Sequence, residues 1–198
     1  MLHSPDAFHD WLAHLRGLSP ATFEEPAEDG PQAAVAMLLR YAERQPHVLL
    51  MRRAERPGDP WSGQISLPGG RAETVDPDLR ATAVRETHEE VGIALRDAAE
   101  PICRLPRRQA RARGGRLGLQ VTPFVFFTEG LPEPDLGPEA AEAFWLPLGA
   151  AARGELADEM PYEHQGQRWR LPAWSFAGHR VWGMTHGMLS QLLTTRPD

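Results

Sequence analysis

The sequence predicts an α/β fold, because strand-like runs and amphipathic helical segments both occur along the 198-residue chain. Short runs rich in Val, Leu and Phe, bounded by Gly or Pro, favour β-strands. A helix with clear start and stop signals is predicted over residues 77–91, and a second amphipathic helix over residues 185–193. Together these elements indicate a sheet with helices packed against it.

The composition excludes several classes of protein. The formal net charge is −6 and all 21 basic residues are Arg. Proteins that coat a nucleic-acid duplex carry a surplus of basic groups, so we expect no duplex as a partner. The longest apolar run, residues 33–39, is far shorter than the roughly 20 residues that cross a membrane, so we expect no membrane partner. The single Cys103 agrees with a reducing, cytoplasmic location.

The first 31 residues are predicted to form a helix and a connector. Ser4 is a suitable N-cap and Pro5 suits the first turn. Apolar residues then follow at helical spacing, at Phe8, Trp11, Leu12 and Leu15. The Pro- and acid-rich stretch 19–31 is typical of a connector. We therefore divide the chain into residues 1–31, the N-terminal helix and connector, and residues 32–198, the main domain.

The main domain is predicted to begin with a hairpin of two strands, 32–39 and 47–52, joined by the turn 43–46. Further strands are predicted at residues 118–128, 144–147, 168–171 and 179–182. The segment from Arg104 to Arg116 contains six Arg and two adjacent Gly, and we expect a mobile loop there. Its role, including a contact with an anionic ligand, stays open.

The helix over 77–91 has the best-defined ends. Asp76 is expected to cap its start, Pro77 suits the first turn, and Gly92 supplies the stop. An apolar stripe with a spacing of four residues is expected to face the core, at Leu79, Ala83, Thr87 and Val91, with Val84 beside it.

Three carboxylates share one face of this helix. Glu86, Glu89 and Glu90 stand at i, i+3 and i+4, which brings their side chains together. Like charges at this spacing destabilise an isolated helix by about 0.2–0.5 kcal/mol per pair, and a divalent cation between them would reverse that effect. Mg²⁺ prefers a few carboxylates, several waters and phosphate oxygens. The spacing alone is also compatible with a solvated acidic face.

The residues around these carboxylates resemble the signature of the Nudix hydrolases. That signature runs Gly, five residues, Glu, seven residues, then Arg-Glu-apolar-any-Glu-Glu-any-Gly-apolar. Residues 85–93 match its second half, with Thr87 at the apolar position. In the first half, Gly70 lies one residue farther from Arg85 than in the signature, and Pro77 stands where the signature has Glu. Asp76 is then expected to substitute for that Glu.

The resemblance implies a Nudix-type α/β/α sandwich with a mixed sheet and a loop–helix–loop catalytic motif. It also implies that Glu86, Glu89 and Glu90 hold one or more Mg²⁺ or Mn²⁺ ions, and that Arg85 orients a carboxylate. Nudix enzymes hydrolyse a nucleoside diphosphate linked to another moiety, which makes a small nucleotide diphosphate derivative the expected substrate.

Such a reaction also needs a general base, and family members often recruit a Glu from outside the helix. Glu139 and Glu142 lie in the corresponding stretch, and Glu139 is preferred because Glu142 is equally compatible with a surface position on the following strand. Glu86 is the alternative base. The expected catalytic residues are Arg85, Glu86, Glu89 and Glu139.

Two further stretches resemble the coenzyme A pyrophosphatase branch of the family: residues 49–54 with 63–70, which precede the signature, and the closing segment 182–189. This resemblance implies coenzyme A or a derivative as substrate, with 3′,5′-ADP and 4′-phosphopantetheine as products. The expected substrate contacts come from the glycine loop, where backbone can approach a pyrophosphate, and from the nearest basic side chains. These residues are Arg52, Arg53, Gly69, Gly70 and Arg71.

Two other functions stay open at this point. One is a Nudix hydrolase for another substrate, such as a nucleotide sugar, a dinucleoside polyphosphate or a damaged nucleotide. The other is a Nudix-like ligand sensor that binds without cleaving, against which the complete set of carboxylates argues. The sequence also leaves the oligomeric state open between a monomer and a homodimer.

Overall fold

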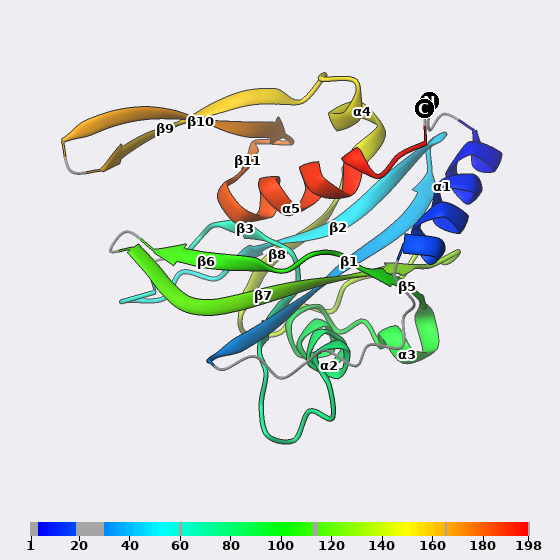
Figure 1. Ribbon diagram of the computed structural model, residues 1–198, viewed down its shortest axis with the longest axis horizontal. Helices are drawn as coiled ribbons and strands as arrows, with labels where there is room; N and C mark the ends of the chain where they lie inside the picture. The colour runs from blue at the N-terminus through cyan, green and yellow to red at the C-terminus, as the bar shows by residue number, and fades with distance from the viewer. Residues whose placement is uncertain (1–3, 19–29, 60, 113–114, 165, 198) are drawn as a thin grey trace.

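A mixed β-sheet lies between helices in the computed structural model of the protein (Figure 1), which describes residues 4–18, 30–59, 61–112, 115–164 and 166–197. The predicted α/β/α sandwich is therefore confirmed. Most of the predicted connector lies outside the described residues. The helices are α1 Pro5–Leu18, α2 Leu79–Val91, α3 Leu95–Ala98, α4 Leu148–Ala152 and α5 Gly183–Thr194.

The strands form two sheets. They are β1 Gln32–Ala42, β2 Gln45–Arg53, β3 Ile65–Ser66, β4 Gly69–Arg71, β5 Glu100–Arg104, β6 Arg108–Ala112, β7 Gly115–Phe127, β8 Ala140–Pro147, β9 Ala157–His164, β10 Gln167–Phe176 and β11 His179–Trp182. The large sheet has the order β3-β2-β1-β7-β5, with β4 paired to β1, β6 to β7 and β8 to β2. Among the strands of the described residues, β1 and β7 are the one parallel pair, and the small sheet has the order β11-β10-β9.

Two hydrophobic clusters cover the two faces of the large sheet. Alternate residues of β1 enter different clusters, as the two-residue period of a strand requires: Met37 and Leu39 enter one, and Ala36 and Leu38 enter the other. Buried side chains of α1 and α5 belong to the first cluster, whereas those of α2 belong to the second. The acidic helix α2 is therefore held against one face of the sheet (Figure 1).

The N-terminal helix agrees with its prediction. The Ser4 hydroxyl accepts a hydrogen bond from the Ala7 N–H, and the four predicted apolar side chains are buried. The indole N–H of Trp11 donates to Thr195 Oγ1 at 3.0 Å, which joins the two ends of the chain.

The predicted hairpin is also present, with a shorter turn than expected. Residues 43 and 44 make a two-residue turn, and both have left-handed backbone, with φ of 50° at Glu43 and 62° at Arg44. Such turns match the twist of the paired strands, and Pro46 lies within β2.

The prediction of a mobile loop between Arg104 and Arg116 is wrong. Strand β6 occupies residues 108–112 and pairs antiparallel with β7, with a register shift between Gln109 and Arg111. Pairing with the long β7 satisfies the backbone of β6, and Ala110 is buried in the core beneath it. Tertiary pairing thus outweighs a composition that favours a loop. Among the described residues, no helix is both long and apolar enough to span a membrane.

Candidate active site

Helix α2 begins later than the sequence predicts, and its cap is Asp78 rather than Asp76. The Asp78 carboxylate accepts from the Ala81 N–H at 2.7 Å, and Leu79 is the first helical residue. Asp76 has other partners, since its carboxylate binds Arg85 and accepts from the Thr82 hydroxyl. The helix ends as predicted, at Gly92, whose φ of 69° is left-handed.

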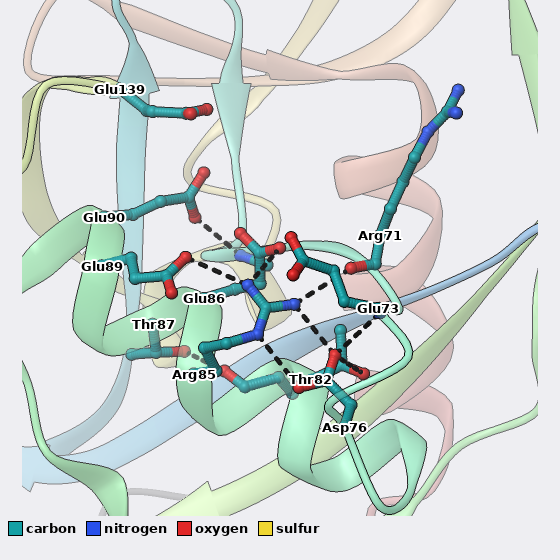
Figure 2. A network of polar contacts seen from close by, with 12 residues as sticks. Arg71, Glu73, Asp76, Thr82, Arg85, Glu86, Thr87, Glu89, Glu90 and Glu139 are labelled. Carbon is teal, nitrogen blue, oxygen red and sulfur yellow. Dashed lines mark hydrogen bonds and ion pairs between the residues drawn. The ribbon is translucent and has the colours of Figure 1, made fainter.

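Arg85 ties the loop before α2 to the acidic face of the helix (Figure 2). Its Nε and Nη2 donate to the two oxygens of Asp76 at 3.0 and 2.9 Å, a forked pair. Its Nη1 donates to Glu86 and Glu89 at 3.0 Å each, and Nη2 also donates to the Arg71 carbonyl. The Arg85 hydrogen bonds hold the pKa of Asp76 well below its usual range. The spacing of the carboxylates on α2 is thus stabilised by one guanidinium.

Glu90 is the buried member of the acidic face. Its residue is only 2% exposed, and burial raises the pKa of its carboxyl to about 8. The Gly69 N–H donates to Oε2 at 2.7 Å, and Arg53 Nη1 lies 4.0 Å from Oε1. A buried carboxyl with so little positive charge beside it is costly to ionise, which is the condition that a bound cation relieves.

Strand β4 packs directly over these carboxyl groups because its first two residues are Gly69 and Gly70. A Cβ on Gly70 would collide with the Glu86 carboxylate, and a Cβ on Gly69 would collide with the backbone of β1. Gly69 also has a φ of 146°, which side-chain-bearing residues rarely adopt. Burial beneath this strand raises the pKa of Glu86. The backbone of β4 therefore lies closer to the acidic face than a residue with a Cβ at position 70 would allow.

Glu139 lies near Glu86 and Glu90 but belongs to the loop between β7 and β8. The loop that follows β7 docks on the end of α2, where the Asp135 and Gly137 N–H groups donate to the carbonyls of Val91 and Glu90. Figure 2 shows the carboxyl groups of Glu139 and Glu90 pointing in the same direction. Arg56 Nη1 lies 3.2 Å from Glu139 Oε1.

A cleft of about 1780 Å³ opens above the acidic face. Small-molecule sites usually measure about 300–1000 Å³, so this cleft has room for an extended ligand. Seven of the expected site residues line it: Arg53, Gly69, Gly70, Arg71, Glu86, Glu90 and Glu139. The structure does not bring the other three to its lining: Arg52 contacts Glu142, and Arg85 and Glu89 contact each other beside it.

The sequence of the chain matches a known protein family. A family model of the NUDIX domain matches residues 17–166. The chain belongs to the Nudix family. As a Nudix hydrolase it is an enzyme of the diphosphatase class.

Among curated relatives, the uncharacterized Nudix hydrolase NudL of Enterobacter sp. (strain 638) is 31% identical over 188 residues, covering 92% of this chain and 91% of the relative. The fold is shared with solved Nudix structures. An Ap4A hydrolase of C. elegans has a TM-score of 0.51 at 20% identity, covering 62% of this chain and 84% of that one. A MutT/nudix family protein of Enterococcus faecalis has a TM-score of 0.51 at 19% identity, covering 95% and 68%.

The acidic face of α2 fits a divalent cation by its chemistry. Its donors are carboxylate oxygens, which suit hard cations, and the ion pair of the buried Glu90 with Arg53 is long, at 4.0 Å. Among the described residues, no three acidic, His or Cys side chains form a ready-made cluster around a cation. Glu86 and Glu89 turn toward Arg85 instead, so cation binding requires these carboxylates to rotate.

Sequence reasoning missed two residues that hold the site together. Asp59 accepts from Arg53 Nη2 at 2.8 Å, and Arg56 holds Glu139 from the same loop. The only signal for this loop was its turn-forming composition, which predicts a bend but not the partners of its side chains. Glu142, the alternative to Glu139, contacts Arg52 and His179 instead of lining the cleft.

Proposed function

We propose that the protein hydrolyses the diphosphate bond of coenzyme A or one of its derivatives to 3′,5′-ADP and 4′-phosphopantetheine, with Mg²⁺ or Mn²⁺. Membership of the Nudix family supports the reaction class. The substrate rests on the coenzyme A-type stretches before and after the signature, and on a cleft large enough for an extended nucleotide.

One observation carries this proposal: Glu86 and Glu90 lie beneath a glycine strand at the floor of the cleft, with Glu139 beside them. A diphosphate bound there would meet backbone on one side and carboxylates on the other. A divalent cation held by Glu86, Glu89 and Glu90 would neutralise the diphosphate and lower the pKa of a water.

The residues of this chain then have distinct roles. The Gly69 N–H and Arg85 fix the directions of Glu90 and Glu86. Arg53 and Arg71, which line the cleft, bind phosphate oxygens through forked contacts in this proposal. Glu139 is the general base that takes a proton from the attacking water, and Arg56 keeps it in place until substrate binds.

The test is a turnover screen with Mg²⁺ and with Mn²⁺. The substrates are coenzyme A, a nucleotide sugar, a dinucleoside polyphosphate and an oxidised nucleoside triphosphate. We expect coenzyme A to have the highest kcat/KM. A higher kcat/KM for another nucleotide would reassign the substrate, and binding without turnover of any of them would contradict the reaction.

The cellular location and assembly belong to the same proposal. A reducing, cytoplasmic compartment agrees with the single buried Cys103, and coenzyme A is a small soluble substrate. The division into residues 1–31 and the hydrolase domain 32–198 stays a prediction, as does a homodimer.

A further inference from the structure

Strands β9 and β10 project as a pair from the body of the molecule (Figure 1). Residues of these two strands and of β11 line one side of the cleft. In this pairing, Tyr162 lies opposite Trp169 and Met160 lies opposite Leu171, so these four side chains share one face. Trp182 lies opposite Ala173, two residues beyond Leu171, and therefore belongs to the same face. We call these five residues the aromatic face: Met160, Tyr162, Trp169, Leu171 and Trp182.

Every residue of the aromatic face lines the same cleft as the catalytic carboxylates. The rings of Tyr162 and Trp182 contact each other, with centroids 6.1 Å apart. Trp169 stands at the outer end and is 53% exposed, an unusual exposure for so large an apolar side chain. Exposed aromatic surface that continues into a catalytic cleft indicates ligand contact.

The cleft has chemically different walls. Its floor carries Glu86, Glu90 and Glu139, which suit a cation and a diphosphate. Aliphatic side chains also line the cleft, among them Leu119 and Val121 of β7 and Met184 and Met188 of α5, and these suit a flexible chain. The rings of Tyr162, Trp169 and Trp182 suit a planar ring system.

We propose that the aromatic face stacks against the base of the nucleotide half of the substrate, with Trp169 as the outer stacking residue and a determinant of specificity. This inference rests on the proposed function, because it places the base relative to a diphosphate on the floor of the cleft. The occupant is a nucleobase rather than a second copy of the chain, since the face is turned toward the cleft that holds the carboxylates.

The experiment is calorimetric titration of AMP and of ribose 5-phosphate, which has no base, into the full chain. We expect AMP to bind at least tenfold more tightly than ribose 5-phosphate. Trp169→Ala should weaken AMP binding about tenfold, the loss expected for one stacked base, without changing the affinity for ribose 5-phosphate. Trp169→Phe should restore most of the affinity, because it keeps an aromatic ring.

The control is Arg170→Ala, which alters the neighbouring position on the opposite face of β10, where Arg170 contacts Glu159. It should bind AMP like the wild type. Unchanged AMP affinity in Trp169→Ala would overturn the inference, and so would an equal loss for both probes. A greater loss for 4′-phosphopantetheine than for AMP would also overturn it, because the face would then serve the other half of the substrate.

A turnover assay separates this inference from the proposed function. If the wild type hydrolyses coenzyme A and Trp169→Ala binds AMP with unchanged affinity, the stacking inference is rejected and the proposed function stands. Loss of AMP affinity in that variant, together with no turnover of any diphosphate by the wild type, rejects the proposed function and leaves the stacking in place.

Discussion

Asp76 and Asp78 stand two residues apart and do different work. Asp78 caps α2 through the Ala81 N–H, whereas Asp76 holds Arg85 with both oxygens. Both side chains are short carboxylates before the same helix, so composition alone cannot distinguish them. What distinguishes them is the length of the Arg85 side chain, which reaches back over the first turns of the helix.

This difference gives a matched pair of variants. Asp76→Asn should lower kcat/KM for coenzyme A about 10–100-fold, because residues that orient ligand-bearing side chains usually contribute that much. Asp78→Asn is the control, since Asn caps a helix as well as Asp does, and its activity should match the wild type. Equal activities of the two variants would show that the Asp76–Arg85 pair does not position the carboxylates.

His47 predicts a pH dependence of stability. It is buried in β2, and burial lowers the pKa of its imidazole below the usual 6.5. The unfolded chain therefore takes up a proton at this histidine first as the pH falls, so the contribution of His47 to stability is present above about pH 6.5 and is lost below it. The raised pKa of the Glu90 carboxyl acts in the opposite sense, because there the folded state takes up the proton first. We therefore expect the urea-unfolding free energy of the wild type to fall relative to that of His47→Gln between pH 7 and pH 5. An identical slope in the variant would contradict this assignment.

At the residue scale, the chemistry of the site was more predictable than its contacts. The spacing of Glu86, Glu89 and Glu90 required only the helical period. The burial of Glu90 depends on β4, and the position of Glu139 depends on a loop docked to the far end of α2. Arg52 and Arg53 are neighbours in sequence, yet the alternation of a strand sends only Arg53 to the cleft.

At the scale of elements, the turn between β1 and β2 contains residual strain. Arg44 has left-handed backbone, which costs a residue with a Cβ about 1–2 kcal/mol, while Gly loses about 0.5–1 kcal/mol more entropy on folding. Arg44→Gly should therefore raise the unfolding free energy by about 1 kcal/mol in chemical denaturation. Arg44→Ala removes the charge but keeps the Cβ, so it should show no such gain. Equal effects of the two variants would mean that charge, not backbone strain, is responsible.

Elements with local signals were predicted, and elements defined by their neighbours were missed. The stripe and the Gly92 stop identify α2 without any partner, and the apolar run of β7 identifies that strand. By contrast, β6 and β9 are polar strands that exist because β7 and β10 pair with them. A pairing partner distant in the chain has no local signature, which is why Arg-rich β6 was predicted to be a loop.

At the scale of the whole molecule, α1 completes the core from outside the cleft. Trp11 is fully buried, and no residue of α1 lines the cleft. Trp11→Ala should lower the unfolding free energy by about 3–5 kcal/mol, as other large truncations in cores do, while kcat at low temperature stays within about twofold. Trp11→Phe should lose much less. A loss below about 1 kcal/mol for the alanine variant would show that α1 contributes little to the core.

The cleft itself could not be predicted from the sequence. Its lining comes from segments between Ala33 and Met188, and their meeting depends on the order of strands in both sheets. The resemblance to the Nudix signature identified the floor of the cleft, because those residues are contiguous on one helix. The aromatic face is set by strand register across β9, β10 and β11, so no local pattern in the sequence brings its residues together.

The most direct test of the whole account is Mn²⁺ binding, measured as loss of the free-ion electron paramagnetic resonance signal in titrations of wild type, Glu90→Gln and the exposed control Glu129→Gln. Glu90→Gln keeps helix propensity and an acceptor for the Gly69 N–H, so it should fold normally. We predict that it binds Mn²⁺ at least tenfold more weakly than wild type, whereas Glu129→Gln binds normally. Equal Mn²⁺ affinity in all three proteins would contradict a cation held on the acidic face of α2.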